Sequence, residues 1–519
     1  MPRLGQIATA GVAASLAIPA AGLVARNATG DGTCTKTTVA ILGGGMAGIS
    51  AAQALTNNSI SDFLILEYND YIGGRAQHTT FGKQDDGSPY TVELGANWAL
   101  ANLVGPAKKY GLKNTFSNYS SILTYNETGP SDFTHLLDEY NEAYEKASAN
   151  AGRLLAENLQ DQTARAGLAL AGWNPKHSDM AAQAVEWWNW GTNLSMNQFS
   201  NENNLVIDSR GYNYIIRQEA STFLKDNDAR LRLNNHITDI HYSDDGVTIY
   251  SDNGSCVSAA YAICTFSVGV LQNDVVTFTP ELPAWKRTSI QKFTMGTYTK
   301  IFMQFNETFW PQDTQYFLYA SPTRRGWYPV FQSLSTEGFL PGSHILFVTV
   351  VAGGSYRVEQ QTDEETKAEI MQVLRDMYPD TTVPEPTAFM YPRWTKTPWA
   401  YGSYSNWPAG TTLEMHQNLR ANAGRLWFAG EATSAEYYGF LHGAWFEGRE
   451  AGYQIASVMQ DKCVEVYNDG TQFCGETRPH YEKLHGTSPL QNYNVLNGWA
   501  TSSFYSSAAA AAAAAKDAE

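Results

Sequence analysis

The stretch TVAILGGGMAGISAAQALTNNSISDFLILEYNDYIGGR, from Thr38 to Arg75, decides the fold of this chain. Its hydrophobic pattern predicts a short apolar strand over Val39–Leu42, an alanine-rich helix that starts near Met46, and a second apolar strand over Phe63–Leu66. A glycine-rich turn separates the first strand from the helix. The stretch is therefore predicted to form a β-α-β unit.

A G-x-G-x-x-G motif, made by Gly43, Gly45 and Gly48, lies between the first strand and the helix. The first glycine allows a tight turn, the second lets backbone N–H groups approach a pyrophosphate, and the third lets helix and strand pack closely. Met46 and Ala47 open the helix, whose N-terminus adds the positive end of a dipole. Three glycines can also form a simple tight turn, but the flanking strand and helix favour a nucleotide site.

Glu67 closes the second strand, where it is placed to accept hydrogen bonds from a ribose. Its negative charge would repel a 2′-phosphate, so the motif predicts FAD or NAD and excludes NADP. Gly74 and Arg75 follow shortly after. An arginine there can neutralise the pyrophosphate or approach a flavin, a role that NAD enzymes do not usually need, and this favours FAD.

Two runs carry a resemblance to a known family: Gly73-Gly74-Arg75 after Glu67, and Glu93-Leu94-Gly95-Ala96-Asn97-Trp98 further on. They resemble the flavin-containing amine oxidases, which include polyamine oxidases, monoamine oxidases and L-amino-acid oxidases. The resemblance extends in the right order from Thr38 to about Ala456. It implies an α/β fold, with a Rossmann-like FAD-binding domain and a discontinuous α+β substrate-binding domain.

The resemblance and the changes of pattern along the chain predict the domain boundaries. The FAD-binding domain is expected to combine residues 36–120, 206–294 and 403–460, and the substrate-binding domain residues 121–205 and 295–402. Residues 461–519 form a C-terminal extension. It includes the alanine run Ala508–Ala515, to which we assign no function.

The resemblance also implies a set of contacts with FAD. The backbone at Ile237 is expected to meet the adenine, Glu431 to hydrogen-bond the cofactor, and the helix after Gly439 to point its N-terminus at the flavin ring. The residues expected to bind the cofactor are Gly43, Gly45, Met46, Ala47, Gly48, Glu67, Gly74, Arg75, Gly95, Ala96, Asn97, Trp98, Ile237, Trp394, Trp399, Gly430, Glu431, Gly439, Phe440 and Leu441.

Lys300 matches the lysine that holds a water near the flavin N5 atom in this family. The pKa of a lysine falls readily on desolvation, which suits it to proton handling. The alternative is a surface lysine on a strand, but the apolar run Ile301–Met303 argues against it.

Aromatic residues match the positions that form the wall of the catalytic tunnel in the family. Tyr404 and Phe440 fall at the two cage positions, and Tyr298 and Trp98 match other aromatic positions of the tunnel. Such rings exclude water and orient an amine. Each alone would more often be a core residue, but their joint occurrence at matching positions favours a catalytic role.

Two departures from the family pattern carry information. Monoamine oxidases hold FAD covalently through a cysteine immediately before the cage tyrosine, where this chain has Ser403, so FAD is expected to be non-covalent. The motif Ser405-Asn406-Trp407-Pro408 is similar to polyamine oxidases of the plant and fungal type. Plant enzymes carry acids at the position of Leu100 and near Asn193, which this chain lacks, so the polyamine and the C–N bond attacked stay open.

The sequence therefore predicts an FAD-dependent polyamine oxidase. It would oxidise spermine, spermidine or N-acetylpolyamines at a secondary amine with O₂, to give an aldehyde, an amine and H₂O₂. One alternative is an L-amino-acid oxidase, for which Arg324, Arg325 or Arg393 would clamp the carboxylate. Another is a catalytically inactive secreted FAD-fold binding protein. An NAD-dependent dehydrogenase is the weakest alternative, because Glu431 and its segment would then have no purpose.

Composition limits the partners. The chain has 519 residues and a net charge of −16, which argues against nucleic-acid binding and suits a cationic substrate, although acidity also serves solubility. The expected partners are a small polyamine and O₂, with no nucleic acid, metal or membrane. The sequence does not reveal the oligomeric state, for which a monomer is slightly favoured.

Met1–Ala25 is typical of a secretory signal peptide, with a disordered N-terminal extension as the alternative. The chain is expected to be a secreted, extracellular or vacuolar glycoprotein. Its N-x-S/T sites are Asn27, Asn57, Asn118, Asn126, Asn193, Asn253 and Asn306.

The five cysteines fit a secreted protein. Cys463 and Cys474 bracket a short polar loop and are predicted to form a disulfide. Cys264 lies in an apolar run and is predicted to be a buried free thiol. Cys34 and Cys256 pair or remain free, and no spacing resembles a zinc site.

Overall fold

The computed structural model describes residues 34–100, 107–156, 161–190, 203–435, 437–465, 472–475 and 477–484. The predicted signal peptide, the sequons at Asn27 and Asn193 and the run Ala508–Ala515 lie outside these residues. No helix in the described part of the chain has the length and apolar character needed to cross a bilayer.

The predicted β-α-β unit is confirmed. It consists of β1 (Thr35–Leu42), α1 (Met46–Asn57) and β2 (Phe63–Leu66), and the two strands pair in parallel. All four residues of β2 are buried, as the uninterrupted apolar run requires for a strand that is covered on both faces.

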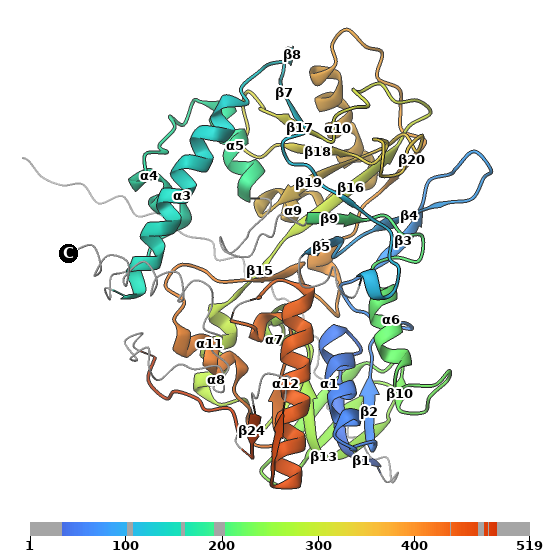
Figure 1. Ribbon diagram of the computed structural model, residues 1–519, viewed down its shortest axis with the longest axis vertical. Coiled ribbons are helices and arrows are strands. Elements are labelled where there is room, and N and C mark those ends of the chain that lie inside the picture. The colour runs from blue at the N-terminus through green and yellow to red at the C-terminus, as the bar shows by residue number, and fades with distance from the viewer. Residues whose placement is uncertain are drawn as a thin grey trace, which may run out of the picture. The chain divides into compact units, whose positions relative to one another are not determined.

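This unit is part of an eight-stranded sheet in the order β10-β2-β1-β13-β12-β11-β14, with β22 beside β13. Figure 1 labels β10, β2, β1 and β13 of this sheet. β1 pairs in parallel with β13, and β13 in parallel with β22. The alternating run from Leu231 to Tyr250 predicts a β-hairpin, which β11 and β12 form, whereas Leu231 and Arg232 pair in parallel with β2 instead. The added strands are β10 (Leu231–Arg232), β11 (Ile237–Tyr242), β12 (Val247–Ser251), β13 (Cys256–Cys264), β14 (Thr277–Thr279) and β22 (Leu426–Phe428).

Helices cover both faces of this sheet. On one face α1, α6 and α12 pack over Val39 and Ile41, and on the other α7, α8 and α11 pack over Ala40 and Leu42. This alternation is the period of two expected of a buried strand. The helices are α6 (Tyr214–Ser221), α7 (Val268–Gln272), α8 (Ala284–Lys292), α11 (Leu413–Arg420) and α12 (Leu441–Gln460).

Glycines bring α12 and α1 close together, and the two helices lie side by side in Figure 1. A Cβ atom on Gly448 would lie 2.0 Å from the carbonyl oxygen of Ala47, and one on Gly452 would lie 2.6 Å from that of Ala51. Because neither glycine carries a side chain, the helix that begins at the C-terminal site motif packs directly on the helix that begins at the glycine motif.

The second large sheet has seven strands in the order β20-β16-β19-β18-β17-β7-β8. One face packs on α10 (Asp363–Met377), and the opposite face of β17 packs on α3 and α5. The pattern of apolar residues predicts strands over Lys300–Phe305 and His344–Val351 and a helix over Asp363–Met377, and the structure forms all three, with the first strand beginning two residues earlier. The strands are β7 (Ile122–Asn126), β8 (Gly129–Pro130), β16 (Tyr298–Gln304), β17 (Tyr316–Tyr319), β18 (Val330–Ser333), β19 (Ile345–Val351) and β20 (Ala388–Met390).

The two sheets draw their strands from different parts of the chain. The first uses residues 35–66, 231–279 and 426–428, and the second uses 122–130, 298–351 and 388–390. Each sheet is thus assembled from segments far apart in sequence. This arrangement supports the discontinuous domains that we predict, whose boundaries stay a proposal.

The remaining elements connect the sheets and complete the site. The strands are β3 (His78–Phe81), β4 (Tyr90–Glu93), β5 (Trp98–Leu100), β6 (Asn114–Phe116), β9 (Asn203–Val206), β15 (Thr294–Gly296), β21 (Tyr404–Asn406), β23 (Cys463–Glu465) and β24 (Gln472–Cys474). The helices are α3 (His135–Ala156), α4 (Ala164–Leu170), α5 (Met180–Trp190) and α9 (Gly353–Val358), with single 3₁₀ turns at η1 (Trp394–Lys396) and η2 (Glu431–Thr433).

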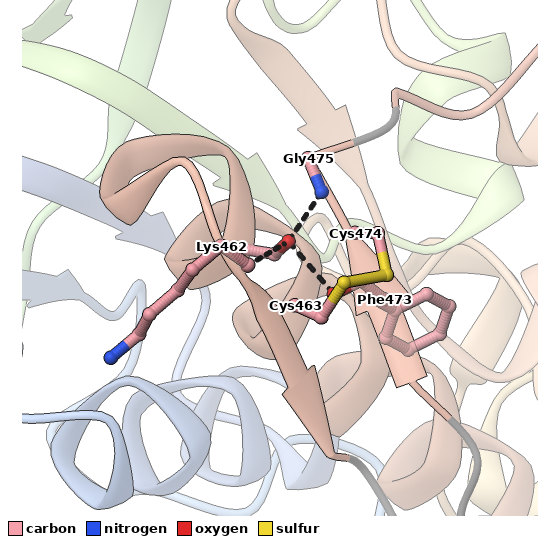
Figure 2. Close-up of a disulfide and its surroundings, with 6 residues drawn as sticks. Lys462, Cys463, Phe473, Cys474 and Gly475 are labelled. Carbon is pink, nitrogen blue, oxygen red and sulfur yellow. Dashed lines mark hydrogen bonds between the residues drawn. A yellow bond between two sulfur atoms is a disulfide. The ribbon is translucent and has the colours of Figure 1, made fainter.

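Two disulfides are present, and the predicted Cys463–Cys474 bridge is one of them, joining β23 to β24 (Figure 2). The second joins Cys34 to Cys256, so the pairing that the sequence left open does form; it ties the beginnings of β1 and β13. Cys264 is a buried free thiol as predicted, and burial raises its pKa to about 12.

Candidate active site

A cavity of about 560 Å³ is lined by residues from both large sheets and from the loops that connect them. Every residue expected to bind the cofactor lines this cavity except Gly48, and every expected catalytic residue lines it except Lys300. Segments as distant as the glycine motif and the start of α12 therefore meet around one space. Gly48 and Lys300 lie behind its wall.

The three motif glycines have different surroundings. Gly43 has a φ of +112°, and a Cβ atom there would lie 2.4 Å from Oγ1 of Thr265. A Cβ atom on Gly48 would lie 1.9 Å from the carbonyl oxygen of Gly43. A Cβ atom on Gly45 would meet nothing within 4 Å. Gly43 and Gly48 thus shape the turn, whereas Gly45 leaves open space beside the cavity.

The N-terminus of α1 faces this open space. No side chain caps the helix and its first turn carries no acid, while Met46 and Ala47 both line the cavity. The first N–H groups of a helix have no partner within the helix, and the helix dipole adds positive potential there. This end of the cavity is suited to an anionic group such as a pyrophosphate.

Glu67 is fixed in the wall next to the glycine motif. Its Oε2 accepts a hydrogen bond from the backbone N of Gly44 at 2.6 Å, and its Oε1 accepts bonds from the backbone and side chain of Asn69 at 2.9 and 2.8 Å. Burial raises the pKa of Glu67, and the bonds from Asn69 and Gly44 oppose that rise. The carboxylate is held where a ribose would approach.

Beyond Glu67 the wall includes Ile237 together with residues that sequence reasoning missed. His236 stacks on Tyr68 with a centroid distance of 4.0 Å, and its Nδ1 lies 3.0 Å from Oδ2 of Asp252. Tyr68 follows β2, His236 directly precedes β11, and Asp252 directly follows β12. The edge of the sheet brings them together, so no local motif identifies them.

Arg75 and Glu431 form an ion pair in the cavity wall. Nη1 of Arg75 donates to Oε1 of Glu431 at 2.8 Å, and the backbone N of Gly439 donates to Oε2 at 2.8 Å. Both the backbone N and the hydroxyl of Ser405 also donate to this carboxylate. Protein donors therefore engage both oxygens of Glu431, which joins three cavity-lining segments.

The wall also presents polar groups that fit a flavin dinucleotide. Oδ1 of Asn97 is buried without a hydrogen-bond partner among the described residues, and Asn97 lines the cavity beside Gly95 and Ala96. A buried unpaired acceptor is unfavourable, so a bound donor would satisfy it. Together with the uncapped start of α1 and the space at Gly45, this feature matches the chemistry of the cofactor.

Lys300 lies on β16 with its side chain buried. Its Nζ donates to the carbonyl oxygen of Gly95 at 2.8 Å and lies 5.8 Å from the centroid of the Trp98 ring. Burial lowers the pKa of Lys300, and the negative charge of Glu93 opposes that effect. Lys300 is therefore a buried residue next to the cavity wall, and not a surface lysine.

Glu93 is a second buried group that sequence reasoning did not select. Its Oε1 accepts a hydrogen bond from the backbone N of Tyr212 at 2.6 Å, while its Oε2 is buried without a described partner. Burial raises the pKa of Glu93, and Lys300 opposes that rise. Glu93 opens the E-L-G-A-N-W run, so the motif itself was the signal that could have found it.

Aromatic rings form the wall beyond Lys300. The Tyr298 ring lies 6.3 Å from Trp98 and 6.4 Å from Tyr404. Phe440 stacks on His442 at 5.2 Å, and burial lowers the pKa of His442 to about 4. His442 is thus a neutral aromatic neighbour at physiological pH. The other predicted pair, Trp394 and Trp399, pack at right angles with centroids 5.7 Å apart.

The arginines considered for a carboxylate clamp are engaged elsewhere. Arg325 pairs with Glu186 at 3.1 Å, Arg393 pairs with Asp363 at 2.8 Å, and Arg324 lies over the Trp327 ring. None of the three is among the described residues that line the cavity. Arg75 does line it, but lies beside Glu431 near the nucleotide end.

Comparison with known proteins identifies the family. The model for flavin containing amine oxidoreductases matches residues 46–456, most of the chain. The chain belongs to this family. The flavin-containing amine oxidoreductase fold accounts for the two sheets, and the cofactor of this family is FAD.

Relatives of this amine oxidoreductase include two plant enzymes. Polyamine oxidase 1 of Zea mays is 36% identical over 475 residues, covering 83% of this chain and 93% of the relative. Polyamine oxidase 7 of Oryza sativa subsp. japonica is 36% identical over 451 residues, covering 79% and 93%. Among solved structures, putrescine oxidase bound to putrescine has the same fold, with a TM-score of 0.61, 19% identity, and coverage of 82% of this chain and 99% of that one.

Proposed function

We propose that this flavin amine oxidase is a polyamine oxidase that attacks a secondary amine of spermine, spermidine or their N-acetylated forms. The observation that carries the proposal is the aromatic-walled cavity beside buried Lys300, in which the three arginines expected of an amino-acid oxidase take no part. The similarity to plant enzymes named polyamine oxidases supports it.

When bound, FAD would supply the two-electron chemistry: loss of a hydride equivalent from the carbon next to the amine nitrogen leaves an imine, and the two electrons reduce O₂ to H₂O₂. Water then hydrolyses the imine to an aldehyde and a shorter amine. The start of α1 and Arg75 would hold the pyrophosphate. Glu67 would accept hydrogen bonds from the ribose, and Asn97 would accept one from the cofactor.

The chain's own residues prepare the amine. The rings of Tyr298, Tyr404 and Phe440 exclude water and orient the substrate nitrogen. Because burial lowers the pKa of Lys300, its Nζ can release or take up a proton, through a water, near neutral pH.

The cofactor is proposed to be non-covalent. The Ser403 hydroxyl accepts a hydrogen bond from the backbone N of Tyr298 at 2.9 Å and lies 3.2 Å from the carbonyl oxygen of the same residue. A serine held in this way offers no thiol to the flavin. Acid precipitation of the holoenzyme should therefore release all of the yellow chromophore into the supernatant, whereas flavin that stays with the pellet would contradict the proposal.

The decisive experiment is the visible spectrum of the purified holoenzyme before and after anaerobic addition of spermine, spermidine or N¹-acetylspermine. Bleaching of the flavin bands by these amines, and not by a panel of L-amino acids, is expected. Bleaching by amino acids alone would favour the L-amino-acid oxidase. A bound flavin that no amine or amino acid bleaches, with no peroxide formed in air, would favour the inactive binding protein.

We also propose that the protein is secreted and glycosylated. Two disulfides support an oxidising compartment. Four sequon asparagines in the described residues are exposed, at Asn57, Asn118, Asn253 and Asn306, and Asn126 is partly exposed. Protein from its native source should lose mass on treatment with an N-glycosidase, and an unchanged mass would contradict glycosylation.

A further inference from the structure

The part of the cavity wall farthest along the second sheet from β16 was not predicted from the sequence. Tyr316 on β17 lies opposite Gln332 on β18, and Thr349 on β19 lies opposite Lys300 on β16. Tyr316, Gln332 and Thr349 line the cavity together with Tyr298. Directly opposed residues of antiparallel strands share a face, so one face of the sheet carries both Lys300 and this wall. We call Tyr119, Trp188, Tyr316 and Gln332 the far wall.

The three rings of the far wall pack against one another. Centroid distances are 5.7 Å between Tyr119 and Trp188, 5.5 Å between Tyr119 and Tyr316, and 5.1 Å between Trp188 and Tyr316. The two contacts of Trp188 are edge-to-face, at 88° and 80°. An aromatic cage for a cation needs ring faces open to it. The three rings cover part of one another's surfaces, so they pack as one largely aromatic wall and not as a cage of separate rings around a cation.

The far wall also lacks a counter-charge for an ammonium group. Among the described residues that line the cavity, the carboxylates are Glu67, Asp252 and Glu431. Glu67 and Asp252 lie at the nucleotide end, and protein donors engage both oxygens of Glu431. A buried cation without a partner is unfavourable, so a protonated distal amine would be poorly held here.

One acid does approach the far wall from behind. Glu186 is on α5, the helix that carries Trp188, but Arg165, Arg325 and the indole N–H of Trp173 bind its carboxylate. It is not among the residues that line the cavity. Its charge is therefore compensated within the protein.

Gln332 supplies the amide of the far wall, which also carries the hydroxyl of Tyr316, likewise buried without a hydrogen-bond partner among the described residues. The side chain of Gln332 is 2% exposed, and its Nε2 is buried without a hydrogen-bond partner among the described residues. A primary amide offers both a donor and an acceptor and carries no charge. It complements a secondary amide, whose carbonyl accepts and whose N–H donates.

We propose that the far wall receives the N-acyl end of an acylated polyamine, an inference that rests on the proposed polyamine oxidation. Gln332 hydrogen-bonds the acetamide group, and the rings of Tyr119, Trp188 and Tyr316 cover its methyl group and the adjoining methylene groups. The enzyme accordingly prefers N¹-acetylspermine to spermine. Acylation removes the positive charge of the terminal amine, for which the far wall holds no counter-charge. It also adds a carbonyl oxygen that can accept a hydrogen bond from Nε2 of Gln332.

The test compares N¹-acetylspermine with spermine by anaerobic rapid mixing and by steady-state kcat/KM for the holoenzyme. The wild type is expected to favour the acetylated amine by tenfold or more in kcat/KM. Gln332→Glu should lower that ratio at least tenfold, because a carboxylate attracts the ammonium of spermine and has no N–H for the acyl oxygen. Gln84→Glu, on an exposed loop, makes the same charge change outside the cavity and should leave the ratio unchanged.

A second variant covers the case in which a buried carboxylate prevents folding. Gln332→Met keeps the size of the side chain and removes its hydrogen bonds, so the preference for the acetylated amine should fall without a gain for spermine. A wild-type ratio at or below one, or a ratio that neither folded variant changes, would overturn the inference while leaving polyamine oxidation intact. A flavin that neither amine reduces would overturn the proposed function as well.

Discussion

The Nζ atom of Lys300 donates a hydrogen bond to the backbone carbonyl of Gly95 at 2.8 Å. Gly95 in turn packs directly on the backbone of Arg75. The approach is so close that a Cβ atom at Gly95 would lie 1.8 Å from the Arg75 carbonyl oxygen. The lysine on the second sheet is thus fixed against the segment that carries the cofactor-side arginine. This hydrogen bond fixes the position of the Lys300 amino group beside the cavity wall.

Replacing Lys300 should slow catalysis. We expect Lys300→Met to lower the rate of flavin reduction or reoxidation tenfold or more, as for loss of a positioned proton-handling group. Stopped-flow absorbance of each half-reaction measures the effect. Lys83→Met, on an exposed loop, is the matched control. Unchanged rates in both half-reactions of Lys300→Met would contradict the catalytic role.

Two alanine substitutions in the glycine motif should have different consequences. Gly45→Ala should leave the fold intact but weaken FAD binding, because its Cβ atom has no protein contact within 4 Å and faces the proposed pyrophosphate site. Gly48→Ala should destabilise the fold, because its Cβ atom would lie 1.9 Å from the Gly43 carbonyl oxygen. Circular dichroism and flavin titration separate the two effects. Full flavin affinity in folded Gly45→Ala would count against the pyrophosphate assignment.

Glu431 should stabilise the holoenzyme through its four protein donors. We expect Glu431→Gln to cost about 1–3 kcal/mol in the free energy of unfolding, because the charge-assisted hydrogen bond to Arg75 is lost in a largely buried site. Denaturant unfolding measures the change. Glu385→Gln breaks the exposed pair with Arg375 and should cost less than about 1 kcal/mol. Equal effects of the two variants would contradict the expectation.

His416 predicts that the protein loses stability in acid. Burial lowers its pKa to about 3 in the folded state from an ordinary value of 6.5. Between these values the unfolded chain binds a proton that the folded chain does not, so the free energy of unfolding falls as the pH falls, by up to about 1.4 kcal/mol per pH unit. Below pH 3 this contribution becomes constant.

The pH dependence can be checked by denaturant unfolding from pH 7 to pH 4. His416→Gln should give a shallower decline than the wild type, since the buried titrating group is removed. His135→Gln changes an exposed histidine at the start of α3 and should follow the wild type. Identical slopes for the wild type and His416→Gln would show that other groups dominate the acid response.

Much of the fold was predicted because its signals are local. The apolar runs of β1 and β2, the glycine motif between them and the periodic pattern of α10 are each readable within a short window. The Cys463–Cys474 bridge closes a short loop and was predicted for that reason. The Cys34–Cys256 pair was left open, because it depends on β1 and β13 becoming neighbours across 222 residues.

The sequence alone was enough to select the residues proposed to hold the cofactor, because the expected contributions of Gly43, Gly45, Glu67 and Arg75 depend on local backbone geometry and charge. Only the tertiary structure decided the composition of the far wall. Gln332 carries no motif, and its place in the far wall follows from strand register and from helix α5 packing beside β17. Pairing sets which face of a strand a side chain occupies and which distant residue lies opposite, and neither can be read from a single segment.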